Sequence, residues 1–219
     1  MIYAAALAAI ELAFLVLASA GRDSAPLRAF VLLNMVLITV FGGIMFPPGM
    51  PTSNIGCVFY SFVLAAVMLL FRRDGTVSVV RILHVIVFSI LMLLAIAVVL
   101  NAMKWDGPAA AAYHEVLEGA YRFSYASLCA FVIGQALYTC LYRKLQHRSV
   151  LWYYVVNMIL VQAVDTALFF PLAFGESSID LLPVALNGFF IKVAIGLLLT
   201  PFVVFLHRPA PVEAAELLP

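Results

Sequence analysis

The sequence predicts an all-α protein, a polytopic bundle of transmembrane helices with about seven spans. Hydrophobic residues make up 66% of the 219 residues and charged residues only 11%, and the mean hydropathy is +1.13. Typical soluble proteins have roughly 45–50% apolar and about 25% charged residues, so this composition requires lipid as the surrounding solvent. The apolar residues also form stretches of bilayer length, and the basic residues fall mainly in alternate connections between them.

Seven apolar stretches are long enough to cross a bilayer whose core is about 30 Å thick, because a helix of about 20 residues has that length. We expect spans at 2–20, 28–46, 55–71, 80–101, 119–142, 150–172 and 181–206. Gly and Pro residues in 42–56 separate the second and third spans, either as a loop or as a broken helix. Residues 1–208 therefore form a single transmembrane domain, followed by a short cytoplasmic tail, 209–219.

Basic residues predict the orientation of the spans, because Lys and Arg remain on the cytoplasmic side. Nine of the twelve Lys and Arg residues follow the first, third, fifth and last spans. They are Arg22, Arg28, Arg72, Arg73, Arg81, Arg143, Lys144, Arg148 and Arg208. In the connections on the opposite side of the membrane, Lys104 is the one Lys or Arg residue. We therefore expect the N-terminus outside, the C-terminus in the cytoplasm, and an odd number of spans.

Several classes of function are disfavoured by what the sequence lacks. A net charge of +1 gives no electrostatic footprint for nucleic acid. The three cysteines, Cys57, Cys129 and Cys140, lack the spacing of a zinc site or a disulfide framework. The histidines are scattered, and no Gly-x-Ser-x-Gly motif is present. We predict no catalytic residue, metal or cofactor, and expect the partners to be a small-molecule substrate and the lipid bilayer.

Five ionisable residues within or at the ends of the predicted spans stand out as candidates for a site: Glu11, Glu118, Arg122, Asp165 and Lys192. Each costs at least about 2.5 to 3.5 kcal/mol deep in a bilayer, so such a side chain usually faces a cavity or a partner. From the rise per residue, Lys192 lies at the midplane, Asp165 about 6 Å and Arg122 about 13 Å toward the outside. These three side chains are predicted to line one outward-facing half-cavity.

Helical spacing places Gln162, Asp165 and Phe169 on one face, which could bind a flat, polar ligand. Gly188 and Gly196 flank Lys192 at intervals of four, which predicts close approach of a neighbouring backbone. The alternative for Asp165 and Lys192 is a purely structural ion pair. Glu118 and Arg122 fit a helix-start salt bridge, and Glu11 stands alone on a peripheral helix.

Four motifs in the second half of the chain occur in a family-specific order. They are Arg122 followed by Ala-Ser and by Ala-Phe-x-x-x-Gln135, a basic loop with a tryptophan at 143–152, Gln-x-x-Asp-Thr-x-x-Phe ending in Ala-Phe at 162–174, and Phe-Ile-Lys at 190–192 with Pro201. With these motifs, the chain from about Met45 to the last span resembles the queuosine-precursor transporter family, also called vitamin uptake transporters. Relative to its six-span members, the first helix is extra.

This resemblance implies import of 7-cyano-7-deazaguanine, or of its 7-aminomethyl relative, across the inner membrane of a bacterium. Asp165 is then the expected acceptor for the N–H and amine of the guanine-like edge. Lys192 tunes the charge of Asp165, and Arg122 orients it or holds the helix start. Stacking faces and the remaining hydrogen bonds come from Phe169, Phe170, Phe174, Gln135 and Gln162. Assembly into a homo-oligomer is left open.

Two other functions fit the same pattern of spans. A membrane-embedded sensor or binding module would use the pocket to detect a ligand and pass a helix shift to a partner. A retinal-binding photoreceptor would use Lys192, in the last of seven spans, for a Schiff base. Net flux of the ligand separates a transporter from a sensor, and a visible absorption band lost in Lys192→Ala marks the photoreceptor.

Overall fold

The computed structural model describes residues 2–21, 23–41, 44–46, 53–102, 110–145, 148–175 and 180–206. Within these ranges the regular secondary structure is helical, apart from an isolated antiparallel bridge between Met45 and Asn54. The helices are α1 (Ile2–Ala20), α2 (Ala25–Phe41), α3 (Gly56–Ala102), α4 (Ala110–Leu145), α5 (Val150–Phe174) and α6 (Leu181–Leu206). The predicted all-α fold is confirmed, and the predicted tail, 209–219, lies outside the described residues.

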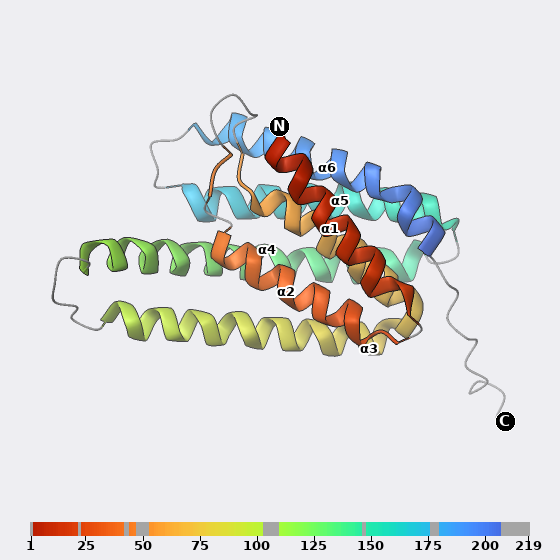
Figure 1. Cartoon of the computed structure of the whole chain (residues 1–219), viewed down its shortest axis with the longest axis horizontal. Helices are drawn as coiled ribbons and strands as arrows, with labels where there is room; N and C mark the ends of the chain where they lie inside the picture. The colour runs from red at the N-terminus through yellow and green to blue at the C-terminus, as the bar shows by residue number, and fades with distance from the viewer. Residues whose placement is uncertain are drawn as a thin grey trace.

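Helix α3 consists of two arms that double back at Gly75 (Figure 1). Gly75 has φ 74° and ψ 176°, a combination of backbone angles that residues with a Cβ rarely adopt. The first arm, Gly56–Gly75, and the second arm, Val80–Leu100, match the predicted third and fourth spans. The bundle therefore contains the seven helical rods that the hydropathy pattern predicts, although two of them are continuous in sequence.

Five rods are long and apolar enough to cross a membrane: the two arms of α3, Tyr121–Leu145, α5 and α6. Two further helical segments are apolar but shorter than these five, namely Ala5–Ala20 within α1 and the whole of α2. Helix α2 begins three residues before the predicted start of its span, because Pro26 is compatible with a first helical turn. It ends at Phe41, immediately before two glycines in the sequence.

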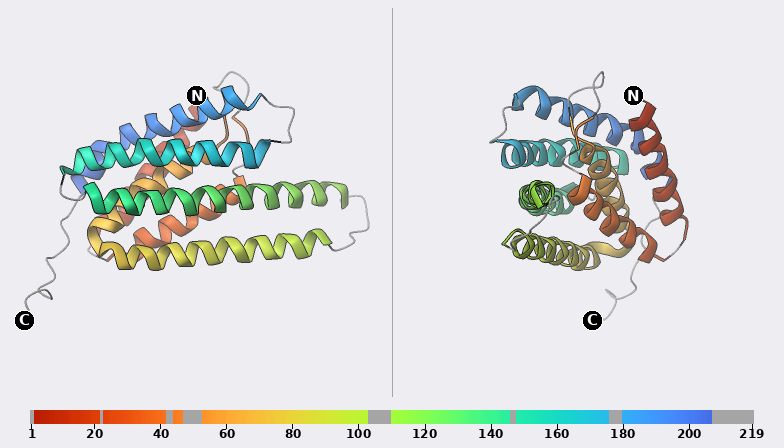
Figure 2. Two further views of the ribbon diagram at one scale, coloured as in Figure 1. Left: turned by 180° about the vertical axis from the view of Figure 1, so that it is seen from behind. Right: turned by 60° about the vertical axis from the view of Figure 1, so that its left-hand side comes forward.

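The first arm of α3 is the centre of the bundle, and nearly all of its residues are buried. Helices α1, α2, α4 and α6 all contact α3, while α5 packs between α4 and α6. The second arm of α3 lies on the outside of the bundle, and few of its residues are buried (Figure 2). Surface side chains such as Phe205 and Leu198 are apolar and more than 70% exposed, which is the expected pattern for helices that face lipid.

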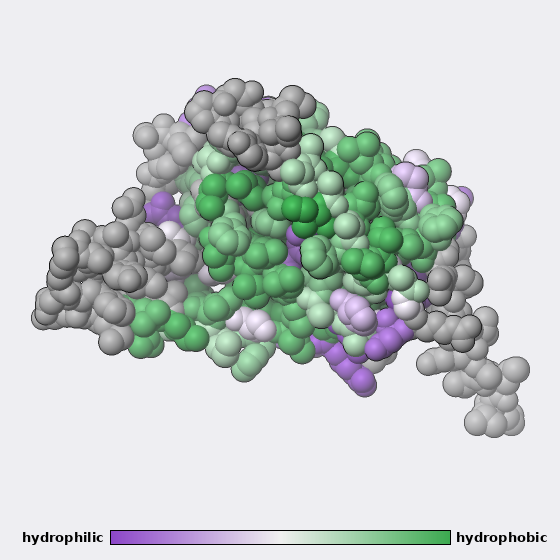
Figure 3. All heavy atoms as spheres, in the orientation of Figure 1, coloured by the Kyte–Doolittle hydropathy of each residue, from purple (hydrophilic) through white to green (hydrophobic). Residues whose placement is uncertain are grey.

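The reversals after α1, within α3 and after α4 gather at the end of the bundle from which α6 leads to the C-terminus (Figure 1). Arg28 forms an ion pair there with Asp74, at 2.5 Å between Nη2 and Oδ2, and Ser24 donates a hydrogen bond to the same carboxylate. Figure 3 shows hydrophilic residues at this end of the visible face and mainly hydrophobic ones over its middle. The connections that follow the first, third and fifth predicted spans therefore lie at one end of the bundle, as the predicted orientation requires.

Candidate functional site

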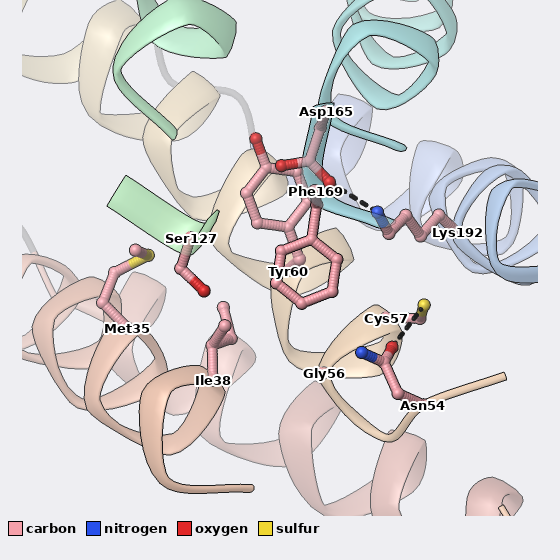
Figure 4. A pocket seen from close by; sticks show the side chains of 10 residues that line it. All are labelled: Met35, Ile38, Asn54, Gly56, Cys57, Tyr60, Ser127, Asp165, Phe169 and Lys192. Carbon is pink, nitrogen blue, oxygen red and sulfur yellow. Dashed lines mark hydrogen bonds and ion pairs between the residues drawn. The ribbon is translucent and has the colours of Figure 1, made fainter. Parts of the chain in front are cut away.

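A small cavity of about 20 Å³ lies among α2, the first arm of α3, α4, α5 and α6. Ten residues line it: Met35, Ile38, Asn54, Gly56, Cys57, Tyr60, Ser127, Asp165, Phe169 and Lys192 (Figure 4). We call this cavity the central site. It combines one acidic and one basic side chain with aromatic and small polar groups, as ligand sites between helices commonly do.

Asp165 of α5 and Lys192 of α6 form an ion pair in the wall of the central site, with Nζ and Oδ2 2.5 Å apart. Their side chains are 7% and 3% exposed. Lys192 Nζ also donates to Thr166 Oγ1 at 3.2 Å and lies over the rings of Tyr60 and Phe170, at 5.3 and 5.7 Å from their centroids. The buried ammonium is thus stabilised by a carboxylate, a hydroxyl and two aromatic faces.

Two glycines of α6 permit this close packing, because they lie one turn before and one turn after Lys192. A Cβ at Gly188 would lie 2.7 Å from Phe170 Cζ, and a Cβ at Gly196 would lie 2.6 Å from Met158 Sδ. The glycine stripe therefore accommodates side chains of α5. Close approach of a neighbouring backbone was the sequence-based expectation, and the atoms nearest to these two glycines belong to side chains instead.

The segment before α3 supplies part of the central site and is not helical where it is described, at 44–46 and 53–55. Phe46 N donates to Ser53 O at 2.8 Å, and Ile55 N donates to Ile44 O at 2.9 Å. This short bridge places Asn54 against the start of α3, where the Cys57 thiol donates to Asn54 Oδ1 at 2.9 Å. The rest of the segment 42–56 whose conformation the sequence leaves open, at 42–43 and 47–52, lies outside the described residues.

Three of the predicted site residues surround the ion pair from α5. Phe169 lines the central site, and Phe170 lies beneath Lys192 and stacks on Phe174 with a centroid distance of 5.8 Å. Phe174 is therefore a second layer behind the aromatic wall. Neither Phe170 nor Phe174 is among the residues that line the cavity itself.

Gln162 is fully buried one turn from Asp165, and its Nε2 donates to Ser61 Oγ at 3.4 Å. Ser61 in turn donates to the backbone oxygens of Cys57 and Lys192, at 3.0 and 3.3 Å. This chain of contacts ties α3, α5 and α6 together directly behind the ion pair. Gln162 thus supports the site in this structure, and contact with a ligand stays a prediction.

Gln135 and Arg122 of α4 do not line the central site. Gln135 is 3% exposed, and its amide Nε2 and Oε1 have no hydrogen-bond partner among the described residues. It adjoins Gly134, where a Cβ would lie 3.2 Å from the Tyr60 hydroxyl. Arg122 is half-buried, and its proposed partner Glu118 is not described at the level of side chains. The roles predicted for both residues stay predictions.

Sequence reasoning missed Tyr60, Asn54 and Cys57, although all three line the site. Their spacing of three residues is a signal that could have found them, because it places polar groups on one face at the start of a helix. Figure 4 shows Tyr60, Asp165 and Lys192 pointing toward one another from three helices. Ser127 of α4 completes the polar lining, and its Oγ has no partner among the described residues.

A protein family described as putative vitamin uptake transporter matches residues 54–206. The match begins at Asn54, includes α3 to α6, and ends with the last residue of α6. It contains every residue of the central site except Met35 and Ile38 of α2. Comparisons with curated proteins and with solved structures give no match.

Proposed function

The chain belongs to the putative vitamin uptake transporter family, and we propose on this basis that it imports 7-cyano-7-deazaguanine, 7-aminomethyl-7-deazaguanine or a related small planar heterocycle across the bacterial inner membrane. One observation carries the assignment of the site. The buried ion pair of Asp165 and Lys192 lies in the wall of a cavity with aromatic rings, inside the segment that matches the family.

The geometry of the pair is compatible with recognition of a guanine-like edge. Lys192 Nζ bonds Oδ2 of Asp165, and a carboxylate has about four acceptor positions on its two oxygens. Asp165 can therefore accept an N–H and an exocyclic amine from the ligand while keeping its contact with Lys192. Such charge-assisted, paired hydrogen bonds are stronger than neutral ones.

Aromatic and small polar side chains supply the remaining contacts in this proposal. Tyr60 and Phe169 border the cavity from different helices, so a planar ligand ring can stack on either of these two side chains. Asn54, Cys57 and Ser127 lie on the same cavity and offer hydrogen-bonding groups to the far edge of the ring. The opposite charges of Asp165 and Lys192 leave the site close to neutral, which favours the uncharged 7-cyano-7-deazaguanine over the 7-aminomethyl compound, whose amine is protonated near neutral pH.

Transport requires the central site to widen. A cavity of about 20 Å³ has room for roughly one water molecule, whereas pockets for small molecules usually have about 300–1,000 Å³. We infer that the helices around Asp165 and Lys192 separate to admit substrate and close again around it. The ion pair is well placed to respond, because it joins α5 to α6.

Uptake by cells that cannot make the precursor tests the proposal. A bacterial strain that lacks both precursor synthesis and its own importer is given a limiting concentration of 7-cyano-7-deazaguanine, and the queuosine content of its tRNA is measured. Expression of this chain should raise that content, and Asp165→Asn at equal membrane abundance should remove the increase. An analogue without the exocyclic amine should compete poorly.

Proteoliposomes with labelled precursor distinguish transport from sensing. Accumulation inside vesicles that contain the protein, but not inside protein-free vesicles, supports a transporter. Saturable binding without accumulation contradicts the proposal and indicates a sensor. Full uptake by the Asp165→Asn variant contradicts the site assignment and leaves transport intact.

A further inference from the structure

A second cavity, which we call the α1–α2 groove, has a volume of about 810 Å³ and lies between the first two helices, with Phe59 of α3 also lining it. Its size is within the range of small-molecule pockets. Apart from Phe59, its lining residues lie outside the segment that matches the family. The proposed import of a heterocycle at Asp165 makes no use of this groove.

Glu11 and Asn34 are the polar side chains of the groove, in an otherwise apolar lining. They are 6% and 1% exposed, respectively, and the Asn34 side chain is hydrogen-bonded to the Glu11 carboxyl group. Asn34 Nδ2 donates to Phe30 O at 3.1 Å, which fixes the orientation of the amide. Its Oδ1 and Glu11 Oε2 have no hydrogen-bond partner among the described residues.

When the Glu11 carboxyl group is ionised, these two neighbouring acceptor oxygens lack donors, and this is costly in apolar surroundings. A buried polar group without a partner costs about 1–3 kcal/mol, and more if it is charged. Glu11 takes part neither in the ion pair of Arg28 with Asp74 nor in that of Lys192 with Asp165. A ligand that donates hydrogen bonds to both oxygens, and carries positive charge, would remove this cost.

We propose that the α1–α2 groove binds a lipophilic primary amine, with its ammonium group on Glu11 and Asn34 and its apolar body along α1 and α2. An ammonium has three N–H donors, and its charge makes the bonds to a carboxylate short and strong. Ile10, Phe14 and Leu17 line the groove and are more than half exposed. The groove therefore opens on the apolar surface, and the amine enters from the lipid.

Other occupants lack the matching chemistry. An anion is repelled by the carboxylate, and a plain hydrocarbon chain leaves both oxygens without donors. A second copy of the chain that docks through α1 brings no cation, because α1 contains no Lys or Arg. The acceptor pair thus selects for a cationic head group, and the apolar walls select for a long or aromatic body.

Photolabelling tests this proposal with an alkyl amine of about twelve carbons that carries a diazirine. The full-length protein is placed in nanodiscs of a neutral phosphatidylcholine lipid, exposed to the probe, irradiated and digested, and the labelled peptides are identified by mass spectrometry. We expect labels on α1 and α2, competed by unlabelled dodecylamine. The alcohol with the same chain and diazirine should label these peptides at least tenfold less.

Three variants make the outcome specific. Glu11→Gln keeps the size of the side chain but removes its charge, and should raise the half-saturating amine concentration at least tenfold. Ala29→Trp places a large ring in the groove from an exposed position of α2, and should block labelling with Glu11 still present. Asp165→Asn should label normally, so failure of the proposed import leaves this result unaffected.

The proposal would be overturned by equal labelling of Glu11→Gln and wild type, by equal labelling by the amine and the alcohol, or by competed labels found only on peptides that do not line the groove. Elution of each variant as a single species before labelling ensures that a loss of signal does not reflect unfolding. Normal labelling of the Ala29→Trp variant would also contradict the position assigned to the ligand.

Discussion

Replacing Asp165 and Lys192 separately and together with neutral side chains of similar size distinguishes a binding site from a structural ion pair. Asp165→Asn leaves a buried ammonium that keeps Thr166 Oγ1 at 3.2 Å and two aromatic faces. Lys192→Met leaves a buried carboxylate without its ion-pair partner. Removal of one member of a buried pair typically costs about 3–5 kcal/mol. We expect Asp165→Asn near the lower and Lys192→Met near the upper end of this range.

The double variant should be far more stable than the sum of the single effects predicts. Well-packed hydrophobic groups of similar volume often replace a buried ion pair at little net cost. The Asn and Met side chains of the double variant leave no buried charge without a partner, so the coupling free energy should be at least about 3 kcal/mol. Reversible unfolding in mixed micelles gives the free energies of unfolding of the four proteins. A coupling below about 1 kcal/mol would contradict the pairing on which this reasoning rests.

Uptake by the same four proteins decides the role of the pair. Asp165 accepts the hydrogen bonds of the substrate in the proposed mechanism, so the double variant should be stable in the membrane but inactive. A purely structural pair makes the opposite prediction, because restored stability then restores uptake. Double-variant uptake close to that of wild type would refute the assignment of Asp165 as the substrate acceptor.

Glycine substitutions provide two further predictions. Gly188→Ala should reduce uptake and lower the free energy of unfolding by about 1–3 kcal/mol, because its Cβ would lie 2.7 and 2.9 Å from two atoms of the Phe170 ring. Gly196→Ala should destabilise the protein less, because the atoms nearest to its Cβ belong to the flexible Met158 side chain. Equal losses in thermal stability would contradict this ranking. Gly75→Ala should lower the free energy of unfolding by about 1–3 kcal/mol through backbone strain alone, since φ is +74° and a Cβ there meets no atom within 4 Å. The control Gly119→Ala in α4 should be neutral or stabilising. An unchanged unfolding transition in Gly75→Ala would contradict this explanation.

Hydropathy predicted the rods of this fold well, because bilayer thickness and the need for internal backbone hydrogen bonds leave few alternatives. It separated the third and fourth rods correctly, but it could not show that the chain reverses between them at Gly75 through a positive φ. It also placed the end of the second span at residue 46, five residues beyond the end of α2 at Phe41. Apolar residues continue past that point, but the chain there forms the bridge at Met45.

The central site was predictable where it contains charge. Asp165 and Lys192 stand out because ionised groups in a membrane require a partner, and their helical positions placed them at similar depths. Tyr60 and Asn54 were harder to find, since their three-residue spacing with Cys57 is a short signal at the start of an arm that is buried on nearly all sides. Their contribution depends on how α3 is surrounded, which a single sequence does not contain.

Glu11 and Asp165 are both buried acids, and their surroundings predict ligands of different charge. Asp165 has an internal cation, so the central site is close to neutral and suits an uncharged ring. Glu11 is hydrogen-bonded to the uncharged Asn34 side chain, and Glu11 Oε2 and Asn34 Oδ1 have no hydrogen-bond partner among the described residues. The sequence shows Glu11 as an isolated charge because Asn34 lies on another helix. Only the packing of α1 against α2 makes them one acceptor pair, which suits a cation from the lipid.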